Sequence, residues 1–313
     1  ARIVAMGIDV RCGLPLATPQ ALAELQANFD AVYLAFGAQR QKRLPQLDYR
    51  RPWVVDGADY LARTSAGAPP ALGPRVLVIG GGSAALDVAR SARRAGHEVT
   101  ILALEAEHGM PAQREEVIEA LEEGIVLVDG AMLQGVVEAP PQGAGGLRLD
   151  CVRVQFEPGA QRGRFTVTPQ PGSEFTLDAD AIASAIGQDP ELGPLGAGFQ
   201  TDGPLLKTDA CGATSADTVW AGGDLTSMAR FVSEAIAMGE RAAVAIDCRL
   251  RLAAGDDSAA AQPAASATAP LVPLAAINLH YHPLQARAAA QHLTVSERLA
   301  HGGEVQLGLA IAQ

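Results

Sequence analysis

The sequence predicts an α/β protein whose sheets are mainly parallel. Segments with helical spacing of apolar residues alternate with short, continuous apolar runs along much of the chain. The clearest unit is a strand, a glycine turn, a helix and a second strand within residues 75–103. A length of 313 residues suggests about two domains, and a hydrophobic content of 48% supports a sizeable core.

In the first half of the chain, periodicity and turn residues predict the elements in order. They indicate a helix at 20–29, an apolar strand at 30–37, a buried strand at 75–79, an alanine-rich helix at 83–95, a strand at 98–103, a helix at 113–123 and a strand at 125–128. Gly96 and Gly124 stand where a glycine commonly ends a helix. On the helix at 113–123, Val117, Ile118 and Leu121 are expected to form one apolar face.

The second half begins with a different pattern. Three segments, at 147–156, 164–168 and 174–177, alternate apolar and polar residues and are separated by Pro and Gly turns. This alternation predicts an antiparallel meander. The remaining expected elements are a buried strand at 181–187, a short strand at 218–221 and a helix at 231–246.

Composition argues against several function classes. The chain has 24 Lys and Arg against 35 Asp and Glu, a formal net charge of −11, and it carries no basic stripe. Nucleic acid is therefore not an expected partner. No apolar run approaches the roughly 18 residues of a membrane span, so we expect no membrane insertion. No secretory signal is recognisable, and the cytoplasm is the expected location.

Cysteine and histidine do not predict a metal site. The four cysteines are too widely spaced for a metal site or a disulfide framework, and no two of them are close enough in sequence to suggest a thiol relay. His280 and His282 have no third ligand nearby in sequence, so a packed loop is the better interpretation of this pair.

The strongest chemical signal is the pattern G-x-G-x-x-A at residues 80–85, placed between a strand and a helix as the dinucleotide fingerprint requires. Its first glycine permits a tight turn, its second lets the backbone approach a pyrophosphate, and the alanine keeps the helix close to the sheet. The helix N-terminus offers N–H groups and the positive end of its dipole to the phosphates. We therefore expect a nucleotide to be bound by Gly80, Gly81, Gly82, Ser83, Ala84 and Ala85.

An acidic residue ends the second strand of this unit. Glu105 is placed to accept hydrogen bonds from the ribose hydroxyls of an adenosine, and its charge repels a 2′-phosphate. The position of this acidic residue is only loosely fixed by spacing. Glu107 is therefore the alternative for the same role, with Glu105 then a solvated loop charge.

A second constellation is a short strand that ends in Gly222, Gly223 and Asp224, followed by a helix. It resembles the distal flavin-binding motif of two-dinucleotide-domain flavoproteins. The resemblance implies that Asp224 accepts hydrogen bonds from the ribityl chain. It also implies that the backbone near Ala235 and Ile236 presents the helix N-terminus to the flavin ring.

Two further strands end alike, on Gly37 and on Gly187. They resemble the paired crossings between flavin and nicotinamide domains, where glycine lets the chain pass close to a cofactor. Each is a weak signal alone, and their order on either side of residues 80–85 is what favours this interpretation.

Together these features resemble the small-subunit type of glutamate synthase and its relatives, flavoproteins that pass electrons from a nicotinamide to iron–sulfur partners. The segments that carry the resemblance are residues 80–87, 110–116, 185–188, 221–224 and 235–242. The resemblance implies a two-dinucleotide-binding-domain flavoprotein in which a Rossmann-like NAD(P)-binding domain is inserted in a partial FAD-binding domain. It also implies FAD and a nicotinamide nucleotide as cofactors, and an iron–sulfur subunit or a larger catalytic subunit as partner.

On this basis the expected domains are a first FAD-binding segment at 1–62, an NAD(P)-binding domain at 63–187 and a second FAD-binding segment at 188–250. Residues 251–270, rich in Ala, Ser and Pro, are expected to form a disordered linker. The tail at 271–313 is expected either to dock on a partner or to wrap around the flavin domain of its own chain.

The sequence departs from the family in three places. No G-x-G-x-x-G precedes residue 80, so we expect only part of the flavin site in this chain. Where NADPH-using members carry paired arginines, this chain has Leu104 and Glu105, which favours NADH and makes NADP the less expected cofactor. The chain also stops before the cysteine-rich segment that follows in some relatives.

The predicted function is thus a flavoprotein oxidoreductase that moves hydride from NADH to FAD and sends electrons on to an iron–sulfur partner. Because the cofactors perform this chemistry, no acid–base residue is expected. Two alternatives stay open. One is an NADPH-dependent glutamate synthase small subunit proper, and the other is a non-catalytic assembly subunit that retains the fold.

Overall fold

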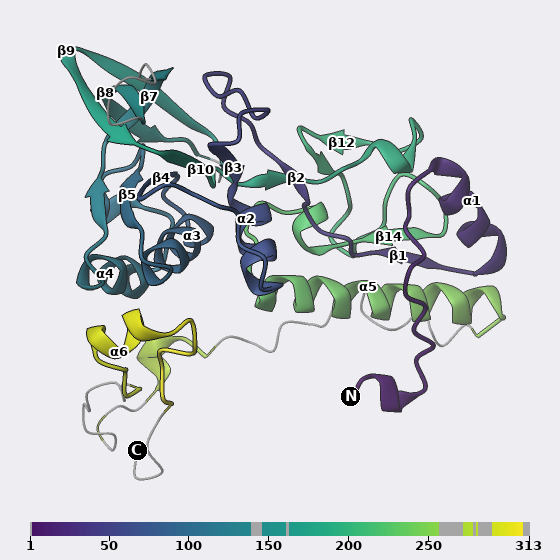
Figure 1. Ribbon diagram of the computed structural model, residues 1–313. Coiled ribbons are helices and arrows are strands. Elements are labelled where there is room, and N and C mark those ends of the chain that lie inside the picture. Colours follow the sequence, from purple (N-terminus) through teal and green to yellow (C-terminus); the bar gives the residue numbers. More distant parts are fainter. Residues whose placement is uncertain are drawn as a thin grey trace. The chain divides into compact units, whose positions relative to one another are not determined.

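The computed structural model describes residues 2–138, 146–160, 163–256, 272–277, 280 and 290–308. Contacts divide the chain into two units (Figure 1): unit 1 comprises residues 1–40 and 189–276, and unit 2 comprises residues 41–188 and 277–313. Unit 2 therefore interrupts unit 1 along the sequence. The predicted α/β class, with one domain inserted in another, is confirmed.

The elements of unit 1 are η1 (Val4–Met6), α1 (Pro19–Asn28), β1 (Val32–Leu34), η3 (Gly193–Leu195), β12 (Thr201–Asp202), β13 (Leu205–Leu206), β14 (Val219–Ala221), η4 (Gly223–Leu225), α5 (Val232–Ala253) and η6 (Leu274–Ala276). Those of unit 2 are β3 (Val54–Asp56), α2 (Gly57–Ser65), β4 (Arg75–Ile79), α3 (Ser83–Arg94), β5 (Glu98–Leu102), η2 (Glu107–Gly109), α4 (Arg114–Glu122), β6 (Val126–Val128), β7 (Ala131–Glu138), β8 (Leu147–Pro158), β9 (Phe165–Ala179), β10 (Ala181–Ser184) and α6 (Val295–Ala300). The short strands β2 (Arg40–Gln41) and β11 (Gln188–Asp189) lie where the chain passes between the units.

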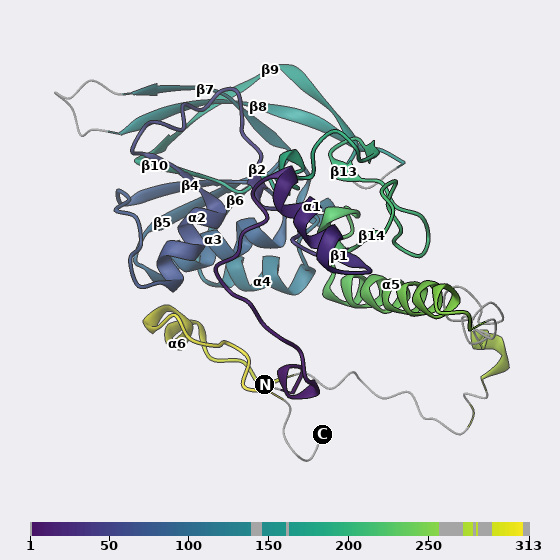
Figure 2. The ribbon, with the colours of Figure 1, turned by 90° about the vertical axis from the view of Figure 1, so that its right-hand side faces the viewer.

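Unit 2 is built on a five-stranded parallel sheet with the order β3-β10-β4-β5-β6. The central strands are mainly apolar and buried, because both faces of the sheet are covered. In β4, Val76 and Val78 pack against the helices, whereas Leu77 and Ile79 pack against the meander. Figure 2 shows α3 and α4 on one face of this sheet and β7, β8 and β9 on the other.

The predicted meander is confirmed as an antiparallel sheet with the order β7-β8-β9. Two details differ from the sequence-based expectation. The strand β7 was not predicted, and its pairing with β8 shifts register near Gly135. The two segments expected at 164–168 and 174–177 belong to one long strand, β9, whose pairing with β8 also shifts register. Such irregularities interrupt the period-2 pattern on which strand prediction depends.

The boundary between the two units lies at residues 40/41, earlier than the domain boundary expected at residues 62/63. Residues 41–62 join unit 2 because β3 pairs in parallel with β10 and α2 follows it directly. A Cβ on Gly57 would stand 2.9 Å from the Cβ of Ala185, so α2 begins in close contact with the end of β10. A three-residue strand such as β3 carries too little periodicity to be recognised in the sequence.

Unit 1 has a separate core in which β1 pairs in parallel with β14, with Val32 opposite Val219. The strand expected at 30–37 is therefore shorter than predicted. The helix expected at 231–246 runs on to Ala253, into the segment expected to be a linker. The rest of that linker, from residue 257, lies outside the described residues, as does His282.

The apolar face expected on α4 is partly wrong. Val117 is buried, but Ile118 is 43% and Leu121 is 40% exposed. Glu119 and Glu123 are buried instead. They occupy the inner face because arginines of α3 pair with them, a contact that hydrophobic periodicity does not reveal.

Residues 290–308 of the C-terminal tail group with unit 2, whereas residues 272–276 group with unit 1. In Figure 1 the helix α6 lies beside α3 and α4, and α6 contacts α3. Residues 290–308 therefore pack against the helices of unit 2. Within the described ranges, no helix is long and apolar enough to cross a membrane.

Candidate functional site

The glycine motif lies at the carboxyl end of β4, where parallel sheets commonly bind ligands. The Gly80 N–H donates to the Leu102 carbonyl at 3.0 Å, which ties the turn to β5. Gly80 has φ of 138°, and a Cβ there would stand 2.5 Å from the Ala185 carbonyl oxygen. Both its conformation and its close approach to Ala185 thus require glycine.

Gly82 is the N-cap of α3 and provides no side-chain cap. A Cβ on Gly82 would meet nothing within 4 Å, so the space in front of this residue is open. Ala85, one turn further, is fully buried between helix and sheet. The first N–H groups of α3, including those of Ser83 and Ala84, therefore face an open site that suits an anion such as a pyrophosphate.

Glu105 follows β5 and is half-buried beside the glycine turn. A Cβ on Gly81 would stand 2.6 Å from Glu105 Oε2, so the carboxylate lies directly against the Gly81 backbone. Burial raises the pKa of Glu105 above its usual value. Glu107, the alternative considered from the sequence, is exposed in η2. Of the two carboxylates, Glu105 is thus the one that reaches the turn.

Sequence reasoning missed one support of this turn. The Ala112 N–H donates to the Gly81 carbonyl at 3.1 Å, and buried Met110 packs into the core below. Ala112 directly precedes Gln113, the N-cap of α4. The segment 110–116 contributes to the family resemblance. Its hydrogen bond to the glycine turn is visible only in the three-dimensional structure.

Gly187 follows β10 with φ of 94°, and its carbonyl accepts a hydrogen bond from the Lys42 N–H at 3.0 Å. Gly37 has φ of 72°. A Cβ on either residue would meet nothing within 4 Å. Their left-handed backbone therefore explains why glycine occurs at both strand ends.

In unit 1, the Gly222–Asp224 turn follows β14. Gly222 has an extended backbone, and a Cβ there would collide with the Tyr33 hydroxyl. Gly223 has φ of 71°, and its N–H contacts the Met238 sulfur at 3.2 Å. The Asp224 carboxylate is half-buried, and no hydrogen bond or ion pair occupies it within the described part of the chain. Tyr33 and Met238, which fix this turn, have no recognisable signal in the sequence.

The helix α5 begins beside this turn. A Cβ on Gly223 would stand 3.6 Å from the Ala235 Cβ. Phe231, the N-cap, gives no side-chain cap hydrogen bond to the first N–H groups of the helix. Around them Val232 and Ile236 are exposed apolar side chains. Backbone N–H groups surrounded by apolar side chains can bind a flat ring, with the N–H groups donating to a carbonyl at its edge and the apolar side chains packing against its face.

Comparison with known proteins decides the family. A family model described as "Pyridine nucleotide-disulphide oxidoreductase" matches residues 16–239. The chain belongs to this family. The family uses FAD and NAD(P), and the open N-terminus of α3 fits such a cofactor. The resemblance drawn from the sequence is thereby confirmed at the level of the family.

Three curated relatives illustrate the likeness. The beta subunit of the NADP(+)-dependent formate dehydrogenase of Moorella thermoacetica is 34% identical over 80% of this chain and 36% of its own length. The NADPH-Fe(3+) oxidoreductase subunit beta of Geobacter sulfurreducens is 36% identical over 61% of this chain and 29% of its own. The glutamate synthase [NADPH] small chain of Azospirillum brasilense is 30% identical over 72% of this chain and 50% of its own. The chain thus spans half or less of each relative.

The predicted site residues fall into two groups. Those of the first group belong to unit 2: Gly80, Gly81, Gly82, Ser83, Ala84, Ala85, Glu105 and Gly187. Those of the second group belong to unit 1: Gly222, Gly223, Asp224, Ala235 and Ile236. Except for Gly187, the residues of the first group lie at or beside the N-terminus of α3. Those of the second group lie at or beside the N-terminus of α5. Across the described residues, no cluster of His, Cys, Asp or Glu is able to hold a metal ion.

Proposed function

We propose that the protein is an NADH-linked flavoprotein oxidoreductase of this family, in which unit 2 binds the nicotinamide nucleotide and unit 1 contributes part of the FAD site. One observation carries the proposal. An open, uncapped helix N-terminus follows Gly82, and the Glu105 carboxylate lies against the adjacent Gly81. This pairing of an anion-binding turn with a ribose-binding carboxylate is the arrangement that a dinucleotide requires.

In unit 2, the residues have separate tasks. The backbone N–H groups at the start of α3 bind the pyrophosphate, helped by the positive end of the helix dipole. The Glu105 carboxylate accepts hydrogen bonds from the adenosine ribose hydroxyls. Gly80 brings this turn close to Ala185, at the end of β10, where the nicotinamide end of the nucleotide would extend.

The choice between the two nucleotides depends on Glu105. A 2′-phosphate would have to lie beside this carboxylate, and two negative charges at such a distance repel each other. NADH is therefore the preferred donor. The second candidate, an NADPH-dependent glutamate synthase small subunit proper, is favoured by the names of the relatives, three of which specify NADP or NADPH.

In unit 1, Asp224 is available to hydrogen-bond the ribityl chain, because no protein group occupies its half-buried carboxylate within the described residues. The positive end of the α5 dipole stabilises negative charge on the ring. When both cofactors are bound, they supply hydride transfer from nicotinamide to flavin and release of single electrons. The protein's own task is to position and tune them, and we name no acid or base.

The electrons are proposed to leave to an iron–sulfur subunit or to the larger catalytic subunit of a complex in the cytoplasm. Support comes from the relatives, whose names describe a subunit beta or a small chain.

The test is anaerobic titration of the purified, flavin-loaded protein with NADH and with NADPH, followed by the flavin absorbance. Bleaching of the flavin by NADH at lower concentration than by NADPH is the expected result. Full-length protein that is purified without flavin absorbance would instead indicate a non-catalytic assembly subunit. Reduction by NADPH alone would favour the second candidate.

A further inference from the structure

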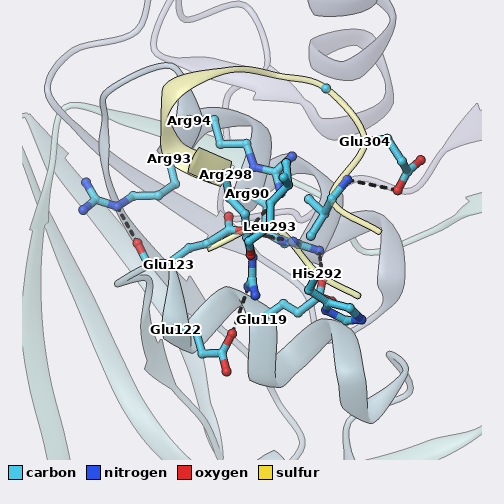
Figure 3. A network of polar contacts seen from close by, with 12 residues as sticks. Arg90, Arg93, Arg94, Glu119, Glu122, Glu123, His292, Leu293, Arg298 and Glu304 are labelled. Atoms are coloured by element: carbon cyan, nitrogen blue, oxygen red, sulfur yellow. Dashed lines mark hydrogen bonds and ion pairs between the residues drawn. The ribbon is translucent and has the colours of Figure 1, made fainter. Parts of the chain in front are cut away.

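The C-terminal segment, residues 290–308, sits on the face of unit 2 formed by α3 and α4. Figure 3 shows the polar contacts of this face, with Arg90 and Arg94 from α3, Glu119, Glu122 and Glu123 from and beside α4, and His292 and Arg298 from the segment. The contacts form two layers. An inner layer joins α3 to α4, and an outer layer joins α4 to the segment.

The inner layer joins α3 to α4. Arg90 pairs with Glu119 and with Glu123, each at 2.7 Å, and Arg94 pairs with Glu123 at 2.9 Å. The Glu123 carboxylate is fully buried. Burial alone would raise its pKa, but hydrogen bonds from Arg90 and Arg94 hold the pKa of Glu123 below its usual value. The ion pairs of this layer are all made within residues 90–123, without the segment.

The outer layer is made by the segment. Arg298 Nη1 contacts Glu122 Oε2 at 2.8 Å, and Arg298 Nε donates to the Leu293 carbonyl at 2.8 Å. The Arg298 side chain is only 7% exposed. His292 Nδ1 lies 3.1 Å from Glu119 Oε1. Arg298 is thus the anchor of the segment, because a buried guanidinium depends on the acceptors that surround it.

The segment is a structural unit of its own. Leu293 and Leu307 donate backbone hydrogen bonds to Val305 and Gln291, and Thr294 caps α6 through a reciprocal pair with Glu297. The buried cluster behind α3 and α4 contains residues of both helices but no described residue of the segment. The contacts that hold the segment are therefore separate from this core, and the segment can leave its seat without opening the core.

Both helices of the seat also reach the proposed nucleotide site. The helix α3 begins at Ser83, directly after the glycine turn, and carries Arg90 and Arg94 in its second half. The helix α4 is preceded by Ala112, which donates to the Gly81 carbonyl, and carries Glu119 and Glu122 near its end. The N-terminal ends of both helices thus lie at the turn, and their other ends lie at the segment, which pairs with α4 and packs against α3.

We propose that residues 290–308 are a reversible docking segment and that its docking is linked to nucleotide binding. The proposal rests on the function proposed above. The docked segment restrains α3 and α4, so a nucleotide that needs their N-terminal turns ordered loses less conformational entropy on binding. By linkage the bound nucleotide favours docking by the same factor. The fraction of chains in which the segment is docked then depends on whether unit 2 has a nucleotide bound.

The direct test is hydrogen exchange of the full chain with and without saturating NADH, monitored at the segment's own amides. Leu293, Arg298 and Leu307 report on it, because their N–H groups bond within the segment and are shielded further when it is docked. NADH should slow their exchange at least about fivefold, the lower end of common coupling factors. Unchanged exchange in nucleotide-saturated protein would overturn the proposal.

The reciprocal test uses Arg298→Glu, which places a like charge beside Glu122. We expect faster exchange in the segment and an NADH affinity lowered about fivefold. The double variant Glu122→Arg/Arg298→Glu restores the pair with reversed charges and should recover both quantities. Arg164→Glu, the same charge change on the exposed meander strand region, is the matched control.

The outcomes separate the two proposals. Lost protection of the segment in Arg298→Glu together with unchanged NADH affinity overturns the linkage while the proposed function stands. A wild-type chain that binds no pyridine nucleotide in the same titration overturns the proposed function, and the linkage with it.

Discussion

The Glu105 carboxylate lies against the backbone of Gly81, so closely that a Cβ on Gly81 would stand 2.6 Å from Glu105 Oε2. This contact joins the end of β5 to the turn after β4, and it leaves room for no side chain at position 81. The ribose-binding and phosphate-binding parts of the proposed nucleotide site are therefore fixed by one contact.

Gly81→Ala should move the Glu105 carboxylate away from the turn, because the methyl group would take its place. We expect the NADH affinity to fall about tenfold, equivalent to about 1.4 kcal/mol. The fold should survive, since the atom displaced is the far end of a flexible side chain. Calorimetric titration measures the affinity. Gly109→Ala, at an exposed position where a Cβ meets nothing within 4 Å, is the control and should bind as the wild type does.

Substitutions of Gly80 and Gly82 should have different effects, the first on the stability of the fold and the second on nucleotide binding. Gly80→Ala places a methyl group 2.5 Å from the Ala185 carbonyl at φ of 138°, and we expect it to lower the free energy of unfolding by about 3 kcal/mol. Gly82→Ala meets open space and should leave that free energy nearly unchanged while it obstructs nucleotide binding. Denaturant unfolding and calorimetry give the two quantities. Equal loss of stability in both variants would contradict this division.

Burial raises the pKa of Glu105 above its usual value, which predicts a pH dependence of stability. The ionised carboxylate then destabilises the folded state, a penalty that is absent below the unfolded-state pKa and grows as the pH rises towards and beyond the folded-state pKa. Glu105→Gln removes it, so the variant should unfold at a higher Tm than the wild type at pH 7. The difference should vanish on acidification to about pH 4. A lower Tm of the variant at pH 7 would show that Glu105 is stabilised by its surroundings.

The strand, glycine turn, helix and second strand at residues 75–103 could be predicted from the sequence almost residue by residue. The strand β4, the helix α3 and the strand β5 match their expected bounds within one residue, because apolar runs, helical spacing and Gly96 agree with one another. The position of Glu105 beside the turn follows from the same unit. Its contact with Gly81 depends on the tertiary packing and could not be predicted.

Other features depend on contacts between distant residues. The acidic inner face of α4 exists because Arg90 and Arg94 approach from another helix, and hydrophobic spacing alone favoured Ile118 and Leu121. Residues 290–308 are held on this face by Arg298, which pairs with Glu122 although 176 positions separate the two residues in sequence. Only a β-pair reveals that β3 belongs to unit 2.

The buried carboxylate between α3 and α4 should be essential for stability. Glu123→Ala leaves the guanidinium groups of Arg90 and Arg94 without their shared partner, and we expect a loss of about 3–5 kcal/mol in the free energy of unfolding. Glu115→Ala, on the exposed side of the same helix, should change it by less than about 0.5 kcal/mol. Urea unfolding of both variants checks the prediction, and a loss below about 1 kcal/mol for Glu123→Ala would contradict it.

The flavin assignment predicts an effect of Asp224. Asp224→Ala removes the acceptor proposed for the ribityl chain, so the purified variant should contain less flavin per chain than the wild type. Asp202→Ala, at an exposed position in β12, is the control and should retain the wild-type content. Absorbance of the released flavin measures both. An unchanged content in Asp224→Ala would remove this residue from the flavin site.

The most direct test of the whole account is calorimetric titration of NADH and NADPH into the wild type, Glu105→Arg and Glu107→Arg. The wild type should bind NADH at least roughly tenfold more tightly than NADPH, because a 2′-phosphate must lie beside the Glu105 carboxylate. Glu105→Arg should abolish or reverse this preference, whereas Glu107→Arg, a change at the exposed neighbouring carboxylate, should preserve it. Equal affinities of the wild type for the two nucleotides, or a preference for NADPH, would contradict the account.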